Sequence, residues 1–150
     1  MLKTTYKHLN TIQKGSFGEA FSKMAFTLEG FEVYNTEYDD RGIDFVIRNS
    51  LGKFYSVQVK ATDENSNPFI RKEKFQSSDD FMLCAVRLVE NKPPSLYLAL
   101  GVDWTKDTEC LHFNPEGGAS GPYYEMRFSN KYLDELSQHE FQIYIEKIRN

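Results

Sequence analysis

Two short apolar runs joined by a polar turn constrain the fold of this chain more than any other feature. Residues 43–47 are rich in β-branched side chains, and residues 54–60 alternate apolar with polar side chains. Between them, residues 49–52 have the composition of a hairpin turn, and Gly52 can adopt the positive φ that such turns require. The sequence therefore predicts an antiparallel β-hairpin over residues 43–60.

An amphipathic helix is predicted before this hairpin, over residues 15–30. Its apolar side chains recur at three- and four-residue spacing, and Gly30 is a suitable stop just past the last apolar turn. Residues 31–34 then alternate like a strand. The face formed by this spacing contains Phe17, Ala20, Phe21, Met24 and Leu28.

The middle of the chain predicts further strands at 81–89 and 96–102, with a short strand at 109–113. Residues 61–80 are polar and predict a loop with a short helical segment near 71–77. These elements predict an α/β domain with a central mixed β-sheet flanked by helices.

The last third is less regular. Residues 116–122 predict a flexible loop, because their glycines lack the strand-before, helix-after context of a phosphate-binding loop. Asn130 can cap a short helix. Residues 141–145 alternate like a strand, but a helix continuing to Ile148 fits the spacing equally, and both interpretations stay open.

Composition favours one folded domain spanning 1–150, with its motif core at about 15–102. The 12 Phe and 9 Tyr residues supply ample apolar area for a core. Cys84 and Cys110 show no metal-ligand or redox spacing and are predicted to be buried thiols. The sequence contains neither a membrane-length apolar run nor a signal peptide, so we expect a cytoplasmic protein with no membrane association.

The charge distribution weighs mildly against a nucleic-acid partner. The net charge is −4, from 18 basic and 22 acidic residues. Residues 1–76 contain 11 Lys or Arg and 10 Asp or Glu, whereas residues 77–150 contain 7 and 12. The densest basic cluster, Arg71, Lys72 and Lys74, lies next to Phe69 and Phe75. This cluster predicts either a contact with a phosphate backbone or a solvated helix face.

One group of residues could perform chemistry together. Asp44 lies at the beginning of the second predicted strand, and Gln58 and Lys60 occupy alternate positions of the third. Alternation directs Gln58 and Lys60 to the same face of the sheet, and the hairpin brings Asp44 beside them. A carboxylate, an amide oxygen and an ammonium group are therefore expected to converge.

This arrangement resembles the PD-(D/E)XK, or restriction-endonuclease-like, nuclease superfamily. The resemblance lies in a helix that carries Glu19, in Asp44 within residues 42–44, and in the Gln58–Lys60 pair that follows after thirteen intervening residues. It covers roughly residues 15–62 and is closest to small stand-alone members such as Holliday junction resolvases and intron homing endonucleases.

The resemblance implies a role for each of these residues. The counterpart of Asp44 is the central metal ligand, that of Gln58 supplies a side-chain oxygen, and that of Lys60 orients or activates the attacking water. The counterpart of Glu19 is a helical acid that reaches the site. The expected metal ligands are therefore Asp44, Gln58 and Glu19, and the implied ion is Mg²⁺, for which Mn²⁺ may substitute.

Two departures from the family pattern affect this expectation. Gln58 stands where Asp or Glu is usual, and Ile43 stands where Pro is usual. A neutral amide oxygen can coordinate Mg²⁺ but adds no charge, which favours one metal ion over two. Glu37, Asp39 and Asp40 are alternative acids, and Glu19 itself lies nearly opposite the main apolar face of its helix.

The sequence thus predicts a Mg²⁺-dependent endonuclease that cleaves DNA by attack of an activated water, acting as a homodimer or larger symmetric oligomer. Two alternatives from other classes remain. One is a nuclease-fold module that binds nucleic acid without cleaving it, with Gln58 as the trace of lost catalysis. The other is a protein-interaction domain that uses the acidic C-terminal half.

Overall fold

The computed structural model describes residues 2–38 and 41–150 and is an α/β fold built on a central mixed sheet. Strands β3 and β5 are parallel, and the other neighbouring pairs are antiparallel. The predicted fold class is confirmed. In spatial order the sheet contains β1 (Glu32–Asn35), β2 (Phe45–Arg48), β3 (Phe54–Asp63), β5 (Phe81–Leu88) and β6 (Ser95–Leu100).

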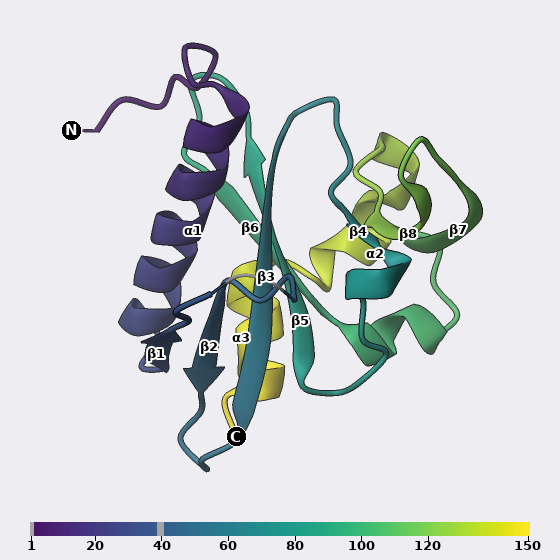
Figure 1. Cartoon of the computed structure of the whole chain (residues 1–150). Coiled ribbons are helices and arrows are strands. Elements are labelled where there is room, and N and C mark those ends of the chain that lie inside the picture. Colours follow the sequence, from purple (N-terminus) through teal and green to yellow (C-terminus); the bar gives the residue numbers. More distant parts are fainter. Residues whose placement is uncertain (1, 39–40) are drawn as a thin grey trace.

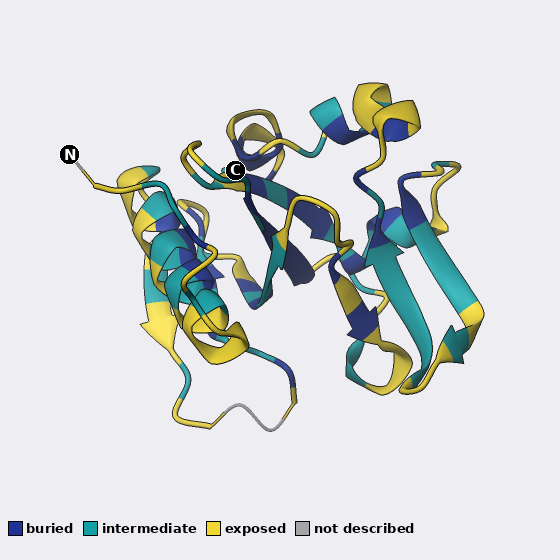
Figure 2. Ribbon diagram, turned by 90° about the horizontal axis from the view of Figure 1, so that it is seen from above, coloured by how far each residue is buried: buried dark blue, intermediate teal, exposed yellow. Residues whose placement is uncertain are grey.

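Two different layers cover this sheet (Figures 1 and 2). Helices α1 (Thr11–Leu28) and α3 (Phe141–Ile148) pack on one face. The other face carries α2 (Leu133–Ser137) and a small three-stranded sheet. The strands of the small sheet, in spatial order, are β4 (Phe69–Arg71), β8 (Gly121–Met126) and β7 (Leu111–Gly118). Short 3-10 turns complete the chain: η1 (Lys72–Lys74), η2 (Gly101–Thr105) and η3 (Asn130–Tyr132).

Helix α1 begins at Thr11, four residues before the predicted start, because a capping box fixes its N-terminus. The Asn10 side chain accepts a hydrogen bond from the Gln13 backbone amide at 2.8 Å. The Gln13 side chain accepts one in return from the Asn10 amide at 2.9 Å. Two amides without helical partners are thereby satisfied, so the helix starts here.

The face of α1 that meets the sheet is rotated relative to the predicted one: Phe17 and Phe21 pack against the core as expected, but the rest of the predicted face does not. Met24 and Leu28 are 56% and 87% exposed, whereas Gly18, Ser22 and Phe26 are buried. Gly18 allows this rotation, because a Cβ at that position would lie 2.9 Å from the Ala61 Cβ on β3. The helix backbone therefore approaches β3 along a line of small side chains.

Alternation along β5 divides the buried side chains into two cores. Met82, Cys84 and Val86 face the helices, and Phe81, Leu83 and Ala85 face the small sheet. Every one of these side chains is completely buried, which makes β5 the most buried strand of the fold. Each large apolar side chain removed from water contributes about 1.5–3 kcal/mol to folding.

The structure replaces the predicted loop at 116–122 with the end of a hairpin. Strand β7 extends to Gly118, well beyond the predicted 109–113, and β8 begins at Gly121. The turn itself is residues 119–120, and Gly117 and Gly121, which have positive φ, lie at the ends of the two strands beside it. Within the predicted loop 61–80, β3 continues to Asp63 and the short strand β4 appears.

The C-terminal ambiguity is resolved in favour of a helix. Phe141, Tyr144, Ile145 and Ile148 are buried at three- and four-residue spacing. A short helix follows Asn130 as predicted, but Asn130 lies within η3 and does not cap it with its side chain. Across the described part of the chain, no helix is both long and apolar enough to span a bilayer. Cys84 and Cys110 are free, buried thiols.

Candidate active site

The β2–β3 hairpin sets the geometry of the candidate site. Its turn is held by the Asn49 side chain, whose Oδ1 accepts hydrogen bonds from the amides of Leu51 and Lys53. This turn fixes the register that pairs Phe45 with Val57. The next position outward on β2 is Asp44, which therefore lies opposite Gln58.

Asp44 occupies the point where the two strands part. Its amide donates to the Val57 carbonyl at 2.9 Å, and its Oδ2 accepts a hydrogen bond from the Val59 amide at 2.7 Å. Because strand amides point within the plane of a sheet, the Asp44 carboxylate occupies the place of a strand partner. A side-chain oxygen thus substitutes for a backbone carbonyl where β2 leaves β3.

Gln58 and Lys60 lie side by side on one face of β3, as the alternation predicted. Gln58 is only 7% exposed. With its amide oriented to satisfy both ends, Nε2 donates to the Gly42 carbonyl at 3.2 Å and Oε1 accepts from Lys60 Nζ at 3.2 Å. The buried amide therefore fixes the position of the ammonium group.

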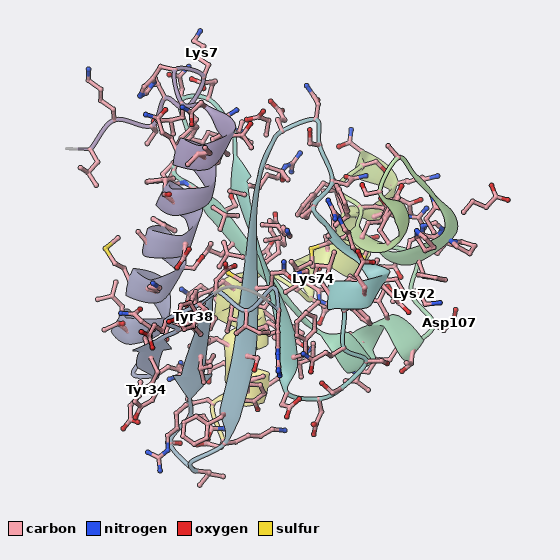
Figure 3. All side chains as sticks on the ribbon, viewed as in Figure 1. Lys7, Tyr34, Tyr38, Lys72, Lys74 and Asp107 are labelled. Atoms are coloured by element: carbon pink, nitrogen blue, oxygen red, sulfur yellow. The ribbon has the colours of Figure 1, made fainter. Side chains whose placement is uncertain are left out.

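Gln58 and Lys60 line a pocket of about 380 Å³, which is also lined by part of the predicted basic cluster. Lys74 lies on the side of η1 that faces β3, and Lys72 lies on the other side (Figure 3). Arg71 enters from β4, so two of the three clustered basic residues share the pocket with Lys60, and Lys72 does not. The pocket is lined by Gly42, Gln58, Lys60, Phe69, Arg71 and Lys74.

Glu19 does not line this pocket, and its helix packs on the opposite face of β3. Gly18, its neighbour on α1, faces Val59 and Ala61, which alternate with Gln58 and Lys60 on β3 and point to the opposite face. Glu19 forms an ion pair with Lys23, with 3.0 Å between Oε1 and Nζ. The Lys23 ammonium also lies 5.7 Å from the centre of the Phe45 ring. The face of α1 that carries Glu19 does turn towards the sheet, but on the helix side.

The charge of Asp44 acts on that helix side as well. The pKa of the Cys84 thiol is raised to about 12: burial raises it most, a hydrogen bond with Ser22 lowers it, and the nearby negative charge of Asp44 adds to the increase. Cys84 belongs to the core beneath α1. The Asp44 carboxylate therefore lies within electrostatic reach of the helix-side core.

The protein offers few oxygen ligands for a hard divalent cation at this site. Among the described residues, no three His, Cys, Asp or Glu side chains are close enough to share a metal ion. Asp44 supplies carboxylate oxygens and Gln58 an amide oxygen, the donor types that Mg²⁺ accepts together with water. These residues fit a cation that keeps most of its waters. Of the alternative acids, Glu37 is exposed, and Asp39 and Asp40 lie outside the described residues.

Two pocket residues, Gly42 and Phe69, were noted in the sequence only as neighbours of Asp44 and of the basic cluster, without a role in the site. Gly42 has φ +75°, and a Cβ there would lie 3.2–3.3 Å from the Gln58 amide and 3.3 Å from Lys74 Cδ. Its position two residues before Asp44 is the signal that could have identified it. Phe69 forms a wall of the pocket from β4, a strand too short to be recognised by periodicity.

Comparison with known proteins identifies the fold. No family model and no curated protein matches the sequence. Among solved structures, a bacterial homing endonuclease, I-Ssp6803I, matches with a TM-score of 0.57, covering 93% of this chain and 95% of that chain. The two chains share a fold. Their sequence identity is 15%, so the likeness shows the architecture alone.

Proposed function

We propose that this chain is a metal-dependent DNA endonuclease of the PD-(D/E)XK type, with Gln58 in the position usually held by an acid. The proposal rests chiefly on the arrangement of Asp44, Gln58 and Lys60 where β2 parts from β3. It is supported by a fold shared with a protein described as a homing endonuclease. Gln58 and Lys60 line an open pocket in that fold, and Asp44 accepts the amide of Val59, the residue between them.

In this proposal Asp44 and Gln58 hold the cation through their side-chain oxygens. When bound, Mg²⁺ or Mn²⁺ supplies charge neutralisation at the phosphate and lowers the pKa of a coordinated water. Glu19 would take part only from the helix side and after release from Lys23, so we assign it a secondary role. The hydrogen bond from the Val59 amide fixes the direction of the Asp44 carboxylate.

The cationic side chains of the pocket have two roles in this proposal, to orient the attacking water and to bind the phosphate. Lys60, whose Nζ is held by the Gln58 amide, is placed to orient a water against the scissile phosphate. Arg71 and Lys74 line the same pocket and can bind non-bridging phosphate oxygens. These contacts offset locally the net charge of −4, which otherwise opposes association with DNA.

One observation favours a second candidate. Gln58 removes a negative charge from the position where related nucleases carry one, which weakens cation binding. A module that binds DNA through Lys60, Arg71 and Lys74 without cleaving it would have the same pocket. The two candidates differ in one measurable property, metal-dependent cleavage.

The test is nicking of supercoiled plasmid by the purified chain with Mg²⁺ or Mn²⁺. Asp44→Asn keeps an oxygen for the Val59 amide, and Lys60→Ala removes only the ammonium group and its stem. Each variant is expected to lose about 100-fold or more in cleavage rate, because each removes a group that acts on the reacting atoms. Circular dichroism establishes that both variants stay folded.

Matched controls come from the same strand region. Lys53 precedes β3 and pairs with Asp79, and Asp63 ends β3 and pairs with Lys14. Lys53→Ala and Asp63→Ala are expected to cleave like the unsubstituted chain. Salt-dependent binding of DNA with no nicking in either metal would replace the endonuclease with the binding module, and absence of both would remove both candidates.

We also propose that cleavage of duplex DNA uses a symmetric dimer, because one site cuts one strand at a time. Sedimentation with and without a DNA duplex measures the number of chains per complex. A single chain bound to a duplex whose two strands are both cut would contradict the dimer.

A further inference from the structure

The small sheet presents a face to solvent that the proposed catalytic pocket does not use. Two rows of side chains cross its three strands on this face, and Ile70, Leu111 and Met126 point the other way into the core. Phe69 is 42% exposed, and the side chains of Arg71, His112 and Glu125 are 56%, 39% and 15% exposed. In register across β4, β8 and β7, the rows are Phe69, Glu125 and His112, and Arg71, Tyr123 and Asn114.

This face is continuous with the catalytic pocket. Phe69 and Arg71 line the pocket that contains Lys60. A second hollow of about 490 Å³ also begins at Phe69 and extends past Tyr123 to residues 118–120 at the tip of the β7–β8 hairpin. A ligand that reaches Lys60 and continues over the Phe69 ring therefore lies along the rows of the small sheet.

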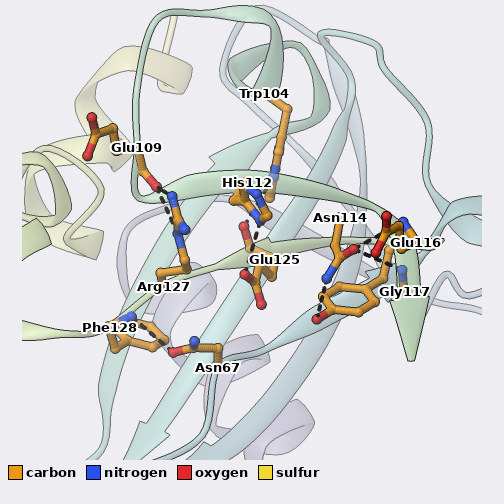
Figure 4. A network of polar contacts seen from close by, with 11 residues as sticks. Asn67, Trp104, Glu109, His112, Asn114, Glu116, Gly117, Glu125, Arg127 and Phe128 are labelled. Atoms are coloured by element: carbon orange, nitrogen blue, oxygen red, sulfur yellow. Dashed lines mark hydrogen bonds and ion pairs between the residues drawn. The ribbon is translucent and has the colours of Figure 1, made fainter. Parts of the chain in front are cut away.

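The kind of side chain changes sharply from the pocket to the small sheet. Lys60, Arg71 and Lys74 concentrate positive charge at the pocket, where a phosphate would lie. Away from the pocket the groups are an imidazole, a carboxylate, an amide and a phenol. His112 Nδ1 and Glu125 Oε1 are 3.2 Å apart, and Asn114 Nδ2 donates to the Tyr123 hydroxyl at 3.2 Å (Figure 4).

These groups suit the edges of bases and not the phosphate backbone. A carboxylate such as Glu125 repels phosphate, but it accepts a hydrogen bond from the amino group of cytosine. Amide side chains pair with adenine, and exposed aromatic rings contact the methyl group of thymine. Backbone contacts position a protein, whereas groups of these kinds distinguish sequences.

The shape of the sheet agrees with entry into a groove. Strand β4 pairs with β8 only from Phe69 to Arg71, so beyond Tyr123 the hairpin continues as a two-stranded ribbon. The major groove of DNA is about 12 Å wide and admits such a ribbon. Residues 117–122 carry neither a charged nor a large aliphatic side chain. At Gly117 a Cβ would lie 1.9 Å from the Gly121 carbonyl oxygen, so the tip is narrow.

We infer that the solvent face of the β4–β8–β7 sheet reads base edges in the major groove of duplex DNA, beside the phosphate that the catalytic pocket holds. The inference rests on the proposed function for its ligand. Tyr123 and His112 determine specificity in this arrangement, and Arg71 joins the reading face to the backbone contacts of the pocket.

The experiment selects bound sequences from a duplex DNA pool with a randomised centre, with Ca²⁺ in place of Mg²⁺ to separate binding from cleavage. The unsubstituted chain is expected to enrich defined bases at a block of adjacent positions. Tyr123→Leu and His112→Ala are each expected to reduce that preference by about tenfold at part of the block, because one set of base contacts is lost. Their salt dependence of binding should stay unchanged, since neither substitution removes a cation.

Two matched variants give the contrast. Tyr34 is 47% exposed on β1, on the far side of β2 and β3, so Tyr34→Leu is expected to preserve the base preference. Arg71→Ala should weaken binding to all sequences and reduce the salt slope by about one. Thermal melts check folding, and Tyr123→Phe with His112→Asn replaces any variant that melts early.

Several results overturn the inference: binding without base preference, no binding, or an unchanged preference in both the Tyr123 and His112 variants. The proposed function fails separately, by absence of nicking with Mg²⁺ and Mn²⁺. A chain that selects sequences through Tyr123 and His112 but never nicks DNA would retain the reading face and lose the endonuclease.

Discussion

The two faces of the central sheet are built for different tasks. The helix side is an apolar core in which Phe26, Phe45 and Phe141 pack edge to face, with ring centres 5.2–6.0 Å apart. The side of the small sheet has a core of its own, but where β2 parts from β3 it opens into the polar pocket around Gln58 and Lys60. Adjacent residues of one strand thus serve packing on one face and proposed chemistry on the other.

This division follows from the two-residue period of a strand. Val57, Val59 and Ala61 face the helices, and Gln58 and Lys60 face the pocket. A substitution on one face therefore reaches the other only through the backbone. Stability and activity are expected to respond to different sets of residues, and each prediction below tests that separation.

The largest effect is expected from Phe26→Ala on the helix side. Phe26 is completely buried and contacts three other aromatic rings, so its removal leaves a cavity that the core cannot easily close. The free energy of unfolding should fall by about 3–5 kcal/mol. Chemical denaturation measures this change.

The matched control for Phe26 lies on the opposite side of the sheet. Phe69→Ala removes a ring that is 42% exposed and should cost clearly less stability. Equal losses for the two variants would contradict the view that the helix side carries most of the stability.

A smaller effect is expected from Gln58→Glu in the pocket. A carboxylate at this position gives the cation a charged oxygen in place of a neutral one, and Lys60 lies beside it to balance the new charge. The Mg²⁺ concentration for half-maximal nicking should fall about tenfold, which corresponds to ~1.4 kcal/mol of binding. An unchanged Mg²⁺ requirement in a folded, active variant would show that residue 58 is not a metal ligand.

The smallest effect concerns pH and a buried acid next to α3. Burial of the Asp103 carboxyl raises its pKa, but hydrogen bonds from Lys106, the Tyr144 hydroxyl and the Leu100 amide outweigh this, and the net pKa is lowered. Because the folded pKa is below the unfolded one, the stabilisation is present above about pH 4 and is lost as pH falls through the folded pKa.

Asp103→Asn should remove this dependence while keeping the shape of the side chain. Between pH 4 and pH 2 the unfolding free energy of the unsubstituted chain should decline more steeply, by at most ~1.4 kcal/mol per pH unit for one group. Urea titrations at several pH values measure the slope. Parallel slopes for the two proteins would show that Asp103 does not couple folding to protonation.

Long periodic segments could be predicted from the sequence, and short or glycine-rich ones could not. The hairpin of β2 and β3 follows from alternation and turn chemistry. Strand β4 has three residues, too few to show a period, and it exists because Ile70 is buried in the core beneath the small sheet. The glycines of 116–122 suggested a loop, although the turn is confined to residues 119–120 and Gly118 pairs with Gly121 across it.

The candidate site, too, could be predicted from the sequence only in part. Local spacing was enough to place Gln58 beside Lys60 and Asp44 at the adjoining strand. It could not show which face of α1 meets the sheet, because that depends on the close approach at Gly18 and not on the apolar stripe. Nor could it show that α1 packs on the face of β3 opposite to Gln58, so Glu19 was expected beside Gln58 but does not line the pocket. The role of each residue in catalysis stays a prediction until the variants are measured.

The Asp44 carboxylate has both a structural role in strand pairing and a proposed role in metal binding. One of its oxygens completes the strand ladder by accepting the Val59 amide, and the same carboxylate is the proposed ligand for the cation. A mutation to a residue without an oxygen acceptor would therefore disturb strand pairing and chemistry together. Selection for a correctly paired hairpin then also preserves the carboxylate, so a descendant that no longer cleaved DNA could still retain Asp44 for its architecture.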